Sequence, residues 1–457
     1  MFIGRNKELS ELNKRYVSGN KEFGVIYGRR RIGKSALIAK FLEDKKGIMF
    51  QAKRDNAYGN LKSFSYSLNK LLNLPRQFVF SSWEEAFDAV AQCAENNRFV
   101  LAIDEYPYII EQDPSFPSIL QEFIDKANDN VFLIISGSDV SLLSKEIKDH
   151  NSPLYKRRTF EMNIVQLPYK EALGFLPKMD NETKASYLAL MSTYPYYLSA
   201  INHEMSFEEN VSNLLFNQYG TFFTLPDQLL SNSTKVQDVY NAILAAISHR
   251  HRTIKEISDQ IHEDDSKVAK YLLTLTDSEL VEKRETFMGN KKTNYYEISD
   301  PLLQFWYSFV FENQERIKIN GNLVFKEEID QIKQFICHGF EGVCRLYIEQ
   351  LNEDGKLDGV FPKPQIYKVE KSKLGRSIEL DGLSLSNDKL LVMECKYRSV
   401  PFDIRMLEHL KESASVFPDK YQREYYIFSK SGFTNEVVQV KKSNVHLIDL
   451  DELFQLA

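Results

Sequence analysis

The sequence predicts an α/β fold whose N-terminal part is built on a parallel sheet. Apolar runs typical of buried parallel strands occur at residues 22–27, 99–103 and 131–135. A segment with helical apolar spacing, residues 34–42, follows the first of these runs. The chain of 457 residues also exceeds the roughly 250 residues at which a single hydrophobic core usually stops growing. We therefore expect three domains.

Composition places the chain among soluble globular proteins. Apolar residues make up 43% and charged residues 27%, and no segment approaches the ~18 uninterrupted apolar residues of a membrane span. The four cysteines are widely spaced, which argues against a disulfide framework or a cysteine zinc site. We therefore expect a cytoplasmic protein without a membrane partner. The net charge of −6 gives no global reason to expect a polyanion partner.

A glycine-rich motif lies at the first predicted strand-to-helix turn. It reads Gly28-Arg29-Arg30-Arg31-Ile32-Gly33-Lys34-Ser35. In such a P-loop the backbone N–H groups and the helix N-terminus cradle phosphates, the lysine reaches the β- and γ-phosphates, and the serine hydroxyl ligates magnesium. The motif predicts an NTPase with ATP and Mg²⁺ as cofactors.

Polar groups that follow the next two strands predict the rest of a nucleotide site. Asp104 and Glu105 end the second run, where Asp104 is expected to hold magnesium through water and Glu105 to orient the attacking water. After the third run a hydroxyl of Ser136-Gly137-Ser138 is a candidate sensor of the γ-phosphate, or else a plain turn residue. Arg157 and Arg158 are candidate arginine fingers, within the chain or across a subunit boundary, or else a solvated basic pair.

Residues 235–310 show the pattern of a winged helix. Helical spacing continues from Lys235, a second helix is expected at 266–275, and wing strands are expected at 280–284 and 294–298, around Gly289-Asn290. Lys283, Arg284, Lys291 and Lys292 cluster at the wing, yet the segment carries more acidic than basic residues, and Lys267 and Lys270 alone make a weak recognition helix. Packing or dimerisation is therefore as consistent with the sequence as DNA contact.

The C-terminal part carries a pattern of metal-dependent phosphodiester chemistry. Asp381 lies on one expected strand, and Glu394 and Lys396 share a face of the next one. Asp381 and Glu394 are expected to bind magnesium, and Lys396 to position water and stabilise phosphate charge. Glu341, on a helical stretch, is a further candidate carboxylate ligand, or else an exposed helix residue.

These motifs together resemble the archaeal-type ATPase family, which is related to AAA+ and STAND NTPases. The matching elements are Phe2-Ile3-Gly4-Arg5 with Glu8-Leu9, the 28–35 motif, Ile103-Asp104-Glu105 and Ser136-Gly137-Ser138. The resemblance implies an α/β nucleotide-binding core, a Phe2–Arg5 segment near adenine and a helical lid. The family's Gly-Gly-x-Pro lid signature is replaced here by Thr193-Tyr194-Pro195-Tyr196-Tyr197.

The last part resembles an uncharacterised domain often fused to these ATPases, which looks like a PD-(D/E)xK nuclease fold. The matching elements are Phe340-Glu341, Glu379-Leu380-Asp381, Glu394-Cys395-Lys396 and the stretch 426–433. The expected organisation is a P-loop core at 1–165, a helical lid at 166–230, a winged helix at 235–310 and an α/β restriction-endonuclease-like domain at 330–457.

Together these patterns predict an ATPase whose nucleotide state controls a fused magnesium-dependent nuclease acting on DNA, in DNA processing or defence. Two alternatives remain open. In one, the chain is a signalling or scaffolding ATPase whose C-terminal domain only binds a partner; in the other, it is an ATP-dependent transcription regulator. DNA is the expected partner, and a homo-oligomer or a protein partner is also consistent with the sequence.

Overall fold

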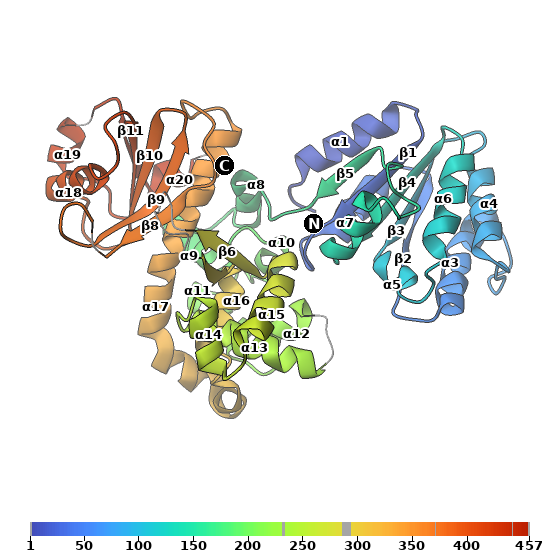
Figure 1. Ribbon diagram of the computed structural model, residues 1–457, viewed down its shortest axis with the longest axis horizontal. Coiled ribbons are helices and arrows are strands. Elements are labelled where there is room, and N and C mark those ends of the chain that lie inside the picture. The colour runs from blue at the N-terminus through green and yellow to red at the C-terminus, as the bar shows by residue number, and fades with distance from the viewer. Residues whose placement is uncertain (1, 231–233, 286–293, 371, 441, 456–457) are drawn as a thin grey trace. The chain divides into compact units, whose positions relative to one another are not determined.

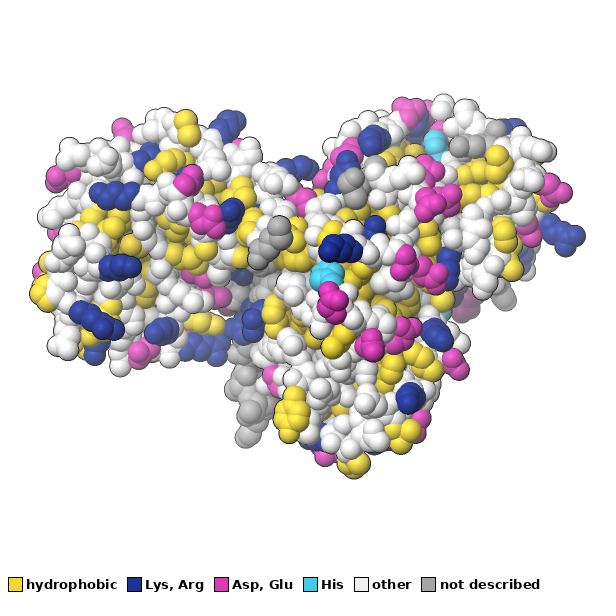
Figure 2. Space-filling view, turned by 180° about the vertical axis from the view of Figure 1, so that it is seen from behind, with side chains coloured by type: hydrophobic (Ala, Val, Ile, Leu, Met, Phe, Trp, Pro, Cys, Tyr) yellow, Lys and Arg dark blue, Asp and Glu magenta, His cyan; other side chains and the backbone are white. Residues whose placement is uncertain are grey.

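A computed structural model of the chain describes residues 2–230, 234–285, 294–370, 372–440 and 442–455 (Figure 1). The chain divides into two compact units, Met1–Gln166 and Leu167–Ala457. Acidic and basic side chains are interspersed over the face seen in Figure 2. Among the described residues, no helix combines the length and apolar character that a bilayer crossing requires.

The first unit is built on a five-stranded sheet in the order β2-β3-β4-β1-β5. All four strand pairs are parallel, so the carboxyl ends of the strands meet at one edge. Every residue of β3 and β4 is buried, which explains their continuous apolar runs. The strands are β1 (Glu22–Tyr27), β2 (Gly47–Gln51), β3 (Phe99–Asp104), β4 (Val131–Gly137) and β5 (Phe160–Asn163). The predicted strands and parallel sheet are confirmed.

Helices cover both faces of this sheet. On one face the ring of Phe41 from α2 lies 5.4 Å from Phe132, and on the other the ring of Phe64 from α3 lies 5.3 Å from Phe50. The helices are α1 (Asn6–Val17), α2 (Lys34–Leu42), α3 (Ala57–Leu72), α4 (Trp83–Cys93), α5 (Pro107–Ile110), α6 (Phe116–Lys126) and α7 (Val140–Lys148). The result is a three-layer α/β/α unit.

The second unit begins with short helices and continues with the segment in which a winged helix was predicted. The first set is α8 (Tyr169–Ala172), the 3₁₀ helix Leu173–Phe175, α9 (Asn181–Met191), α10 (Pro195–Leu198), α11 (Phe207–Leu215) and α12 (Leu225–Leu229). The next set is α13 (Thr234–Ser248), α14 (Ile254–Ile261), α15 (Asp265–Asp277), β6 (Val281–Glu285), β7 (Asn294–Ile298) and α16 (Pro301–Phe309). Strands β6 and β7 pair antiparallel, as a wing requires, and the predicted residues Gly289, Asn290, Lys291 and Lys292 lie outside the described residues.

The C-terminal part of this unit is a long helix and a mixed sheet. The sheet order is β12-β11-β10-β9-β8, with β10, β11 and β12 parallel and β8, β9 and β10 antiparallel. The elements are α17 (Gln314–Glu353), β8 (Gln365–Val369), β9 (Ile378–Ser386), β10 (Lys389–Lys396), α18 (Ile404–Ala414), β11 (Gln422–Ser429), α19 (Asn435–Gln439), β12 (Val445–Asp449) and α20 (Leu450–Phe454).

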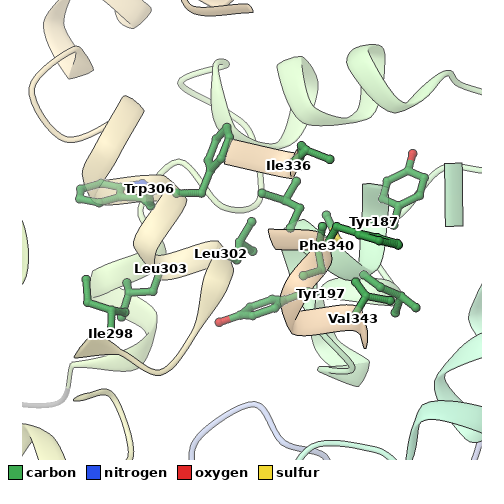
Figure 3. Close-up of a cluster of buried hydrophobic side chains, with 14 of the residues drawn as sticks. Tyr187, Tyr197, Ile298, Leu302, Leu303, Trp306, Ile336, Phe340 and Val343 are labelled. Carbon is green, nitrogen blue, oxygen red and sulfur yellow. The ribbon is translucent and has the colours of Figure 1, made fainter. Parts of the chain in front are cut away.

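One apolar core joins these parts of the second unit. Figure 3 shows Tyr187 of α9, Tyr197 of α10, Trp306 of α16 and Phe340 of α17 in the same buried cluster. Helices from the predicted lid, the middle segment and the C-terminal segment therefore share their buried surface.

A buried polar contact inside this unit fixes the start of α16. Asp300 is fully buried, and its Oδ1 accepts from the backbone N–H groups of Leu302 at 2.8 Å and Leu303 at 3.1 Å. Its Oδ2 accepts from the hydroxyl of Tyr197 at 2.5 Å. The side chain is thus both a helix cap and the partner of a buried hydroxyl.

Asp300→Ala is expected to lower the free energy of unfolding by about 2–4 kcal/mol, because it removes a cap and leaves the Tyr197 hydroxyl buried without this acceptor. Urea unfolding of the full chain measures the loss. The control is Asp180→Ala, which removes the exposed cap of α9 at a cost of about 1 kcal/mol. Equal losses for the two variants would contradict a special role for Asp300.

Candidate nucleotide site and C-terminal carboxylate site

The P-loop backbone takes conformations that need glycine. Gly28 has φ 149° and Gly33 has φ 99°, and between them Arg31 has φ 65°. A Cβ atom at Gly28 would lie 2.2 Å from the carbonyl oxygen of Ile164. The close approach of residue 164 explains why only glycine fits at the first position of the motif.

Lys34 lies over the loop that precedes it. The side chain is buried, and its ammonium group donates to the carbonyl oxygens of Gly28 at 2.8 Å and Arg29 at 3.0 Å. Helix α2 begins at Lys34, so the ammonium group and the N-terminal end of the helix lie at the same loop. This arrangement gathers positive charge where phosphates bind in P-loops.

The carboxylate of Asp104 is completely buried and accepts from two hydroxyl groups. Ser35 donates to Oδ2 at 2.6 Å, and Ser136 donates to Oδ1 at 2.6 Å. Ser136 is itself fully buried on β4. The hydroxyl of Ser136 is thus engaged in orienting Asp104, and its role as a phosphate sensor stays a prediction.

Glu105 occupies a strained position directly after β3. Its φ of 53° lies in the left-handed region, which costs a non-glycine residue free energy. Its Oε2 accepts from the hydroxyl of Ser138 at 3.2 Å. Residue 138 is therefore the hydroxyl beside the predicted catalytic carboxylate, a contact that the sequence pattern alone could not distinguish from one made by residue 136.

The N-terminal segment is tied to the P-loop by Arg5. This side chain is only 2% exposed; it forms an ion pair with Glu8 at 2.9 Å and donates to the carbonyl oxygens of Ile32 and Val165. The contact with Ile32 fixes the segment beside the loop. The implied approach of Phe2–Arg5 to adenine stays a prediction.

Arg157 lies away from the P-loop. Its guanidinium donates to both carboxylate oxygens of Asp125, each at 3.0 Å. The backbone N–H of Thr159, two residues later, donates to the carbonyl oxygen of Phe23. This bond places Arg157 near the edge of the sheet where β1 begins. The P-loop follows the opposite end of β1. Within this unit Arg157 is not brought to the nucleotide site, so an arginine-finger contact would need a second copy of the chain and stays a prediction. Arg158 pairs with Glu161 at 2.7 Å.

The residues around the P-loop fit a magnesium nucleotide. The hydroxyl of Ser35 and a carboxylate oxygen of Asp104 lie together beside the phosphate-binding loop, and both are oxygen donors of the kind that Mg²⁺ prefers. Ser35 would ligate the ion directly, and Asp104 would act through water.

A second group of charged side chains lies on β9, β10 and α17. The Oδ2 of Asp381 accepts from the backbone N–H of Cys395 at 2.7 Å and lies 4.0 Å from the ammonium group of Lys396. Lys396 also pairs with Glu394. Two carboxylates and one cation from neighbouring strands thus lie together, and their role in binding magnesium stays a prediction.

Burial dominates the electrostatics of this group. Burial raises the pKa of Asp381. The pKa of Glu394 and that of Glu341 are raised mainly by burial and, to a smaller extent, by the nearby negative charge of Asp381. The pKa of Lys396 is raised. Burial alone would lower it, but the negative charges of Glu394 and Asp381 together have the larger effect. Buried groups with perturbed pKa values are typical of functional sites.

The predicted set of three carboxylate ligands is not assembled. Within the described ranges, no group of three or more His, Cys, Asp or Glu side chains has a metal-binding arrangement. Cations lie among the carboxylates instead: Arg345 lies 3.7 Å from Glu341 and donates to the carbonyl oxygen of Asp381 at 2.9 Å. Magnesium needs only one or two protein carboxylates, because it keeps several waters, so Asp381 and Glu394 fit it by donor chemistry. Glu341 as a ligand stays a prediction.

Two families match separate parts of the chain. Residues 2–190 match the model of an "ATPase domain predominantly from Archaea". Residues 306–410 match a family described as "Archaea bacterial proteins of unknown function". The N-terminal part is therefore similar to archaeal ATPase domains, and the C-terminal part is similar to a family without an assigned function. Neither description assigns nuclease activity.

Curated relatives and solved structures are more distant. An uncharacterised protein of Methanocaldococcus jannaschii is 28% identical over 438 residues, which cover 94% of this chain and 96% of that one. An uncharacterised ATP-binding protein of the same organism is 46% identical over 46 residues, 10% of this chain and 78% of that one.

The Aeropyrum pernix ORC2 protein, in ADPNP and ADP complexes, aligns with a TM-score of 0.40 at 12% identity over 71% of this chain and 95% of that one. The ORC1 protein of A. pernix in complex with DNA aligns with a TM-score of 0.36 at 13% identity over 69% of this chain and 95% of that one.

Gly28→Ala is expected to weaken ATP binding by at least about tenfold, because the added Cβ collides with the backbone of residue 164 in a conformation unfavourable to alanine. Titration with a fluorescent ATP analogue measures the affinity. The control is Gly19→Ala, a turn glycine with φ 75° and nothing within 4 Å of the added Cβ. Unchanged affinity in Gly28→Ala would contradict the assignment of this loop.

Proposed function

We propose that this chain is a magnesium-dependent ATPase whose N-terminal unit binds and hydrolyses ATP. The observation that carries the proposal is the buried Asp104 carboxylate, held by the hydroxyl groups of Ser35 and Ser136 beside the P-loop. The two hydroxyl groups offset the cost of burying this carboxylate, and a buried carboxylate beside a phosphate-binding loop is suited to holding a magnesium ion.

Each residue at the loop has a definite part in the proposal. Lys34 and the N-terminal end of α2 bind the β- and γ-phosphates, and Ser35 and Asp104 hold the ion that neutralises phosphate charge. Glu105 orients the attacking water and accepts its proton, with the Ser138 hydroxyl fixing one of its carboxylate oxygens.

Glu105→Gln is expected to lower ATP turnover by about 100-fold or more while ATP binding persists, because the amide keeps the shape but cannot accept a proton. Phosphate release measures turnover, and nucleotide titration measures binding. The matched control is Glu111→Gln, an exposed carboxylate at the end of α5, which should leave turnover unchanged. Normal turnover in Glu105→Gln would remove this residue from the catalytic role.

We propose a second activity, magnesium-dependent cleavage of DNA, for the C-terminal domain. The specific support is the contact of Lys396 with both Asp381 and Glu394 on adjacent strands, with all three groups largely withdrawn from water. Asp381 and Glu394 would hold the metal, and Lys396 would stabilise charge on the phosphate. In this proposal DNA is the substrate and the nucleotide state of the ATPase unit controls access to it.

Asp381→Ala and Lys396→Ala are each expected to abolish nicking of supercoiled and single-stranded DNA in magnesium or manganese, assayed with and without ATP. The matched control is Glu379→Gln, an exposed carboxylate of β9 paired with Lys368 at 2.7 Å, which should cut like the wild type. If no form cuts DNA while ATP is hydrolysed, the C-terminal domain is a partner-binding module of a signalling or scaffolding ATPase.

A further inference from the structure

Helix α3 of the first unit carries a regular stripe of aromatic and basic side chains on its solvent face. Tyr58, Lys62, Tyr66 and Lys70 follow one another every four residues, and all four are exposed, Tyr58 by 63% and Tyr66 by 41%. Residues four apart lie on the same side of a helix, about 6 Å apart along its axis. Tyrosine and lysine therefore alternate along an oblique row, which turns by about 40° around the helix at each step.

The core does not account for this stripe. Helix α3 packs through Leu61, Phe64 and Leu68, which face away from the exposed line. The ammonium group of Lys62 lies 5.9 Å from the centre of the Tyr66 ring, and neither Lys62 nor Lys70 has a carboxylate partner in the described part of the chain. Large exposed rings beside uncompensated cations indicate a binding surface rather than a solvated face.

Helix α3 itself is positively charged although the chain is acidic overall. Residues 57–72 contain two lysines and no acidic residue, whereas the whole chain carries −6. The loop after α3 adds Arg76, an exposed residue whose carbonyl oxygen accepts from the Asn69 side chain at 3.3 Å. The basic surface therefore continues past the end of the helix.

We propose that this stripe binds single-stranded DNA. The rings of Tyr58 and Tyr66 stack on unpaired bases, and Lys62 and Lys70 pair with the phosphates between them, which is the combination by which proteins hold single strands without reading sequence. A duplex buries its base faces, so the rings have no stacking partner there. The binding step is independent of the C-terminal domain and of ATP hydrolysis.

Contacts within the same unit connect the beginning of this helix to the P-loop. The guanidinium carbon of Arg54, three residues before α3, lies 5.0 Å from the centre of the Tyr108 ring. The hydroxyl of Tyr108 accepts from Arg30 of the P-loop at 2.8 Å, and Tyr108 lies three residues after Glu105. Strand binding at α3 therefore alters ATP turnover through Tyr108, a step that rests on the proposed ATPase function.

Binding is tested with the full-length chain and fluorescent oligothymidylate, by anisotropy and without nucleotide. The double variant Tyr58→Ala/Tyr66→Ala is expected to bind about 30-fold more weakly, since each lost stacking contact costs about 1 kcal/mol. Tyr58→Phe/Tyr66→Phe should restore the affinity, because phenylalanine keeps the stacking face. The logarithm of the affinity falls linearly with the logarithm of the salt concentration, by about 0.7 for each phosphate contact to a single strand. Lys62→Ala/Lys70→Ala removes two such contacts and should make this slope shallower by about 1.4.

Matched controls separate the stripe from general surface effects. Tyr219→Ala removes a tyrosine that is 86% exposed in the other unit, and Lys14→Ala removes an exposed lysine of α1; both should bind like the wild type. Thermal melts of each variant verify folding. Affinity within twofold of the wild type in the double tyrosine variant, an equal loss in the controls, or a preference for duplex DNA or for RNA of the same sequence overturns the proposal.

The connection to the P-loop is tested by ATP turnover with and without the oligonucleotide. Tyr108→Phe should keep the DNA affinity within about twofold but bring the ratio of the two rates close to one. An unchanged ratio in this variant overturns the role of Tyr108 and leaves strand binding standing. If the wild type hydrolyses no ATP, the proposed ATPase function fails, while the anisotropy result still decides the binding proposal.

Discussion

The buried carboxylate of Asp104 is the point at which the parts of the nucleotide-binding unit meet. Burying an ionised carboxylate is unfavourable unless hydrogen bonds replace its hydration, and here two hydroxyl donors do so at 2.6 Å each. One donor comes from α2, directly after the P-loop, and the other from β4. Strand β3 must therefore lie beside β4, with α2 across its carboxyl end, and the parallel sheet order meets this requirement.

The C-terminal group of charges follows the same physical rule in a different way. Lys396 lies between Asp381 and Glu394, and Arg345 lies near Glu341, so each buried carboxylate has a cation nearby. Burial still raises the pKa of all three carboxylates, which shows that these contacts do not fully replace water. An incompletely compensated charge cluster is unfavourable for folding alone, and such clusters persist where a ligand or substrate completes them.

The sequence predicted those features that depend on residues close together along the chain. The strand before Gly28, the helix from Lys34, the buried runs ending at Asp104 and Ser136, and the strands carrying Asp381 and Glu394 are all local patterns, and the structure has them. It could not predict that Ser136 bonds to Asp104, because that contact depends on β4 lying next to β3. The position of Arg157 at the far edge of the sheet, and of Tyr108 between Arg30 and Arg54, likewise depends on which elements become neighbours in space.

The basic side chains of the middle segment and those of α3 differ in how they are paired. Two of the basic residues that made the middle segment a DNA-binding candidate are paired, since Arg284 lies 3.0 Å from Glu282 and 2.9 Å from Glu297, and Lys267 bonds to Glu263 at 2.7 Å. A carboxylate beside a cation reduces the local positive charge that attracts a phosphate. Within the described residues, the two lysines of α3 have no carboxylate partner, and an exposed ring lies between them. The proposed DNA-binding surface therefore lies in the first unit, at a helix that Arg54 and Tyr108 connect to Arg30 of the P-loop.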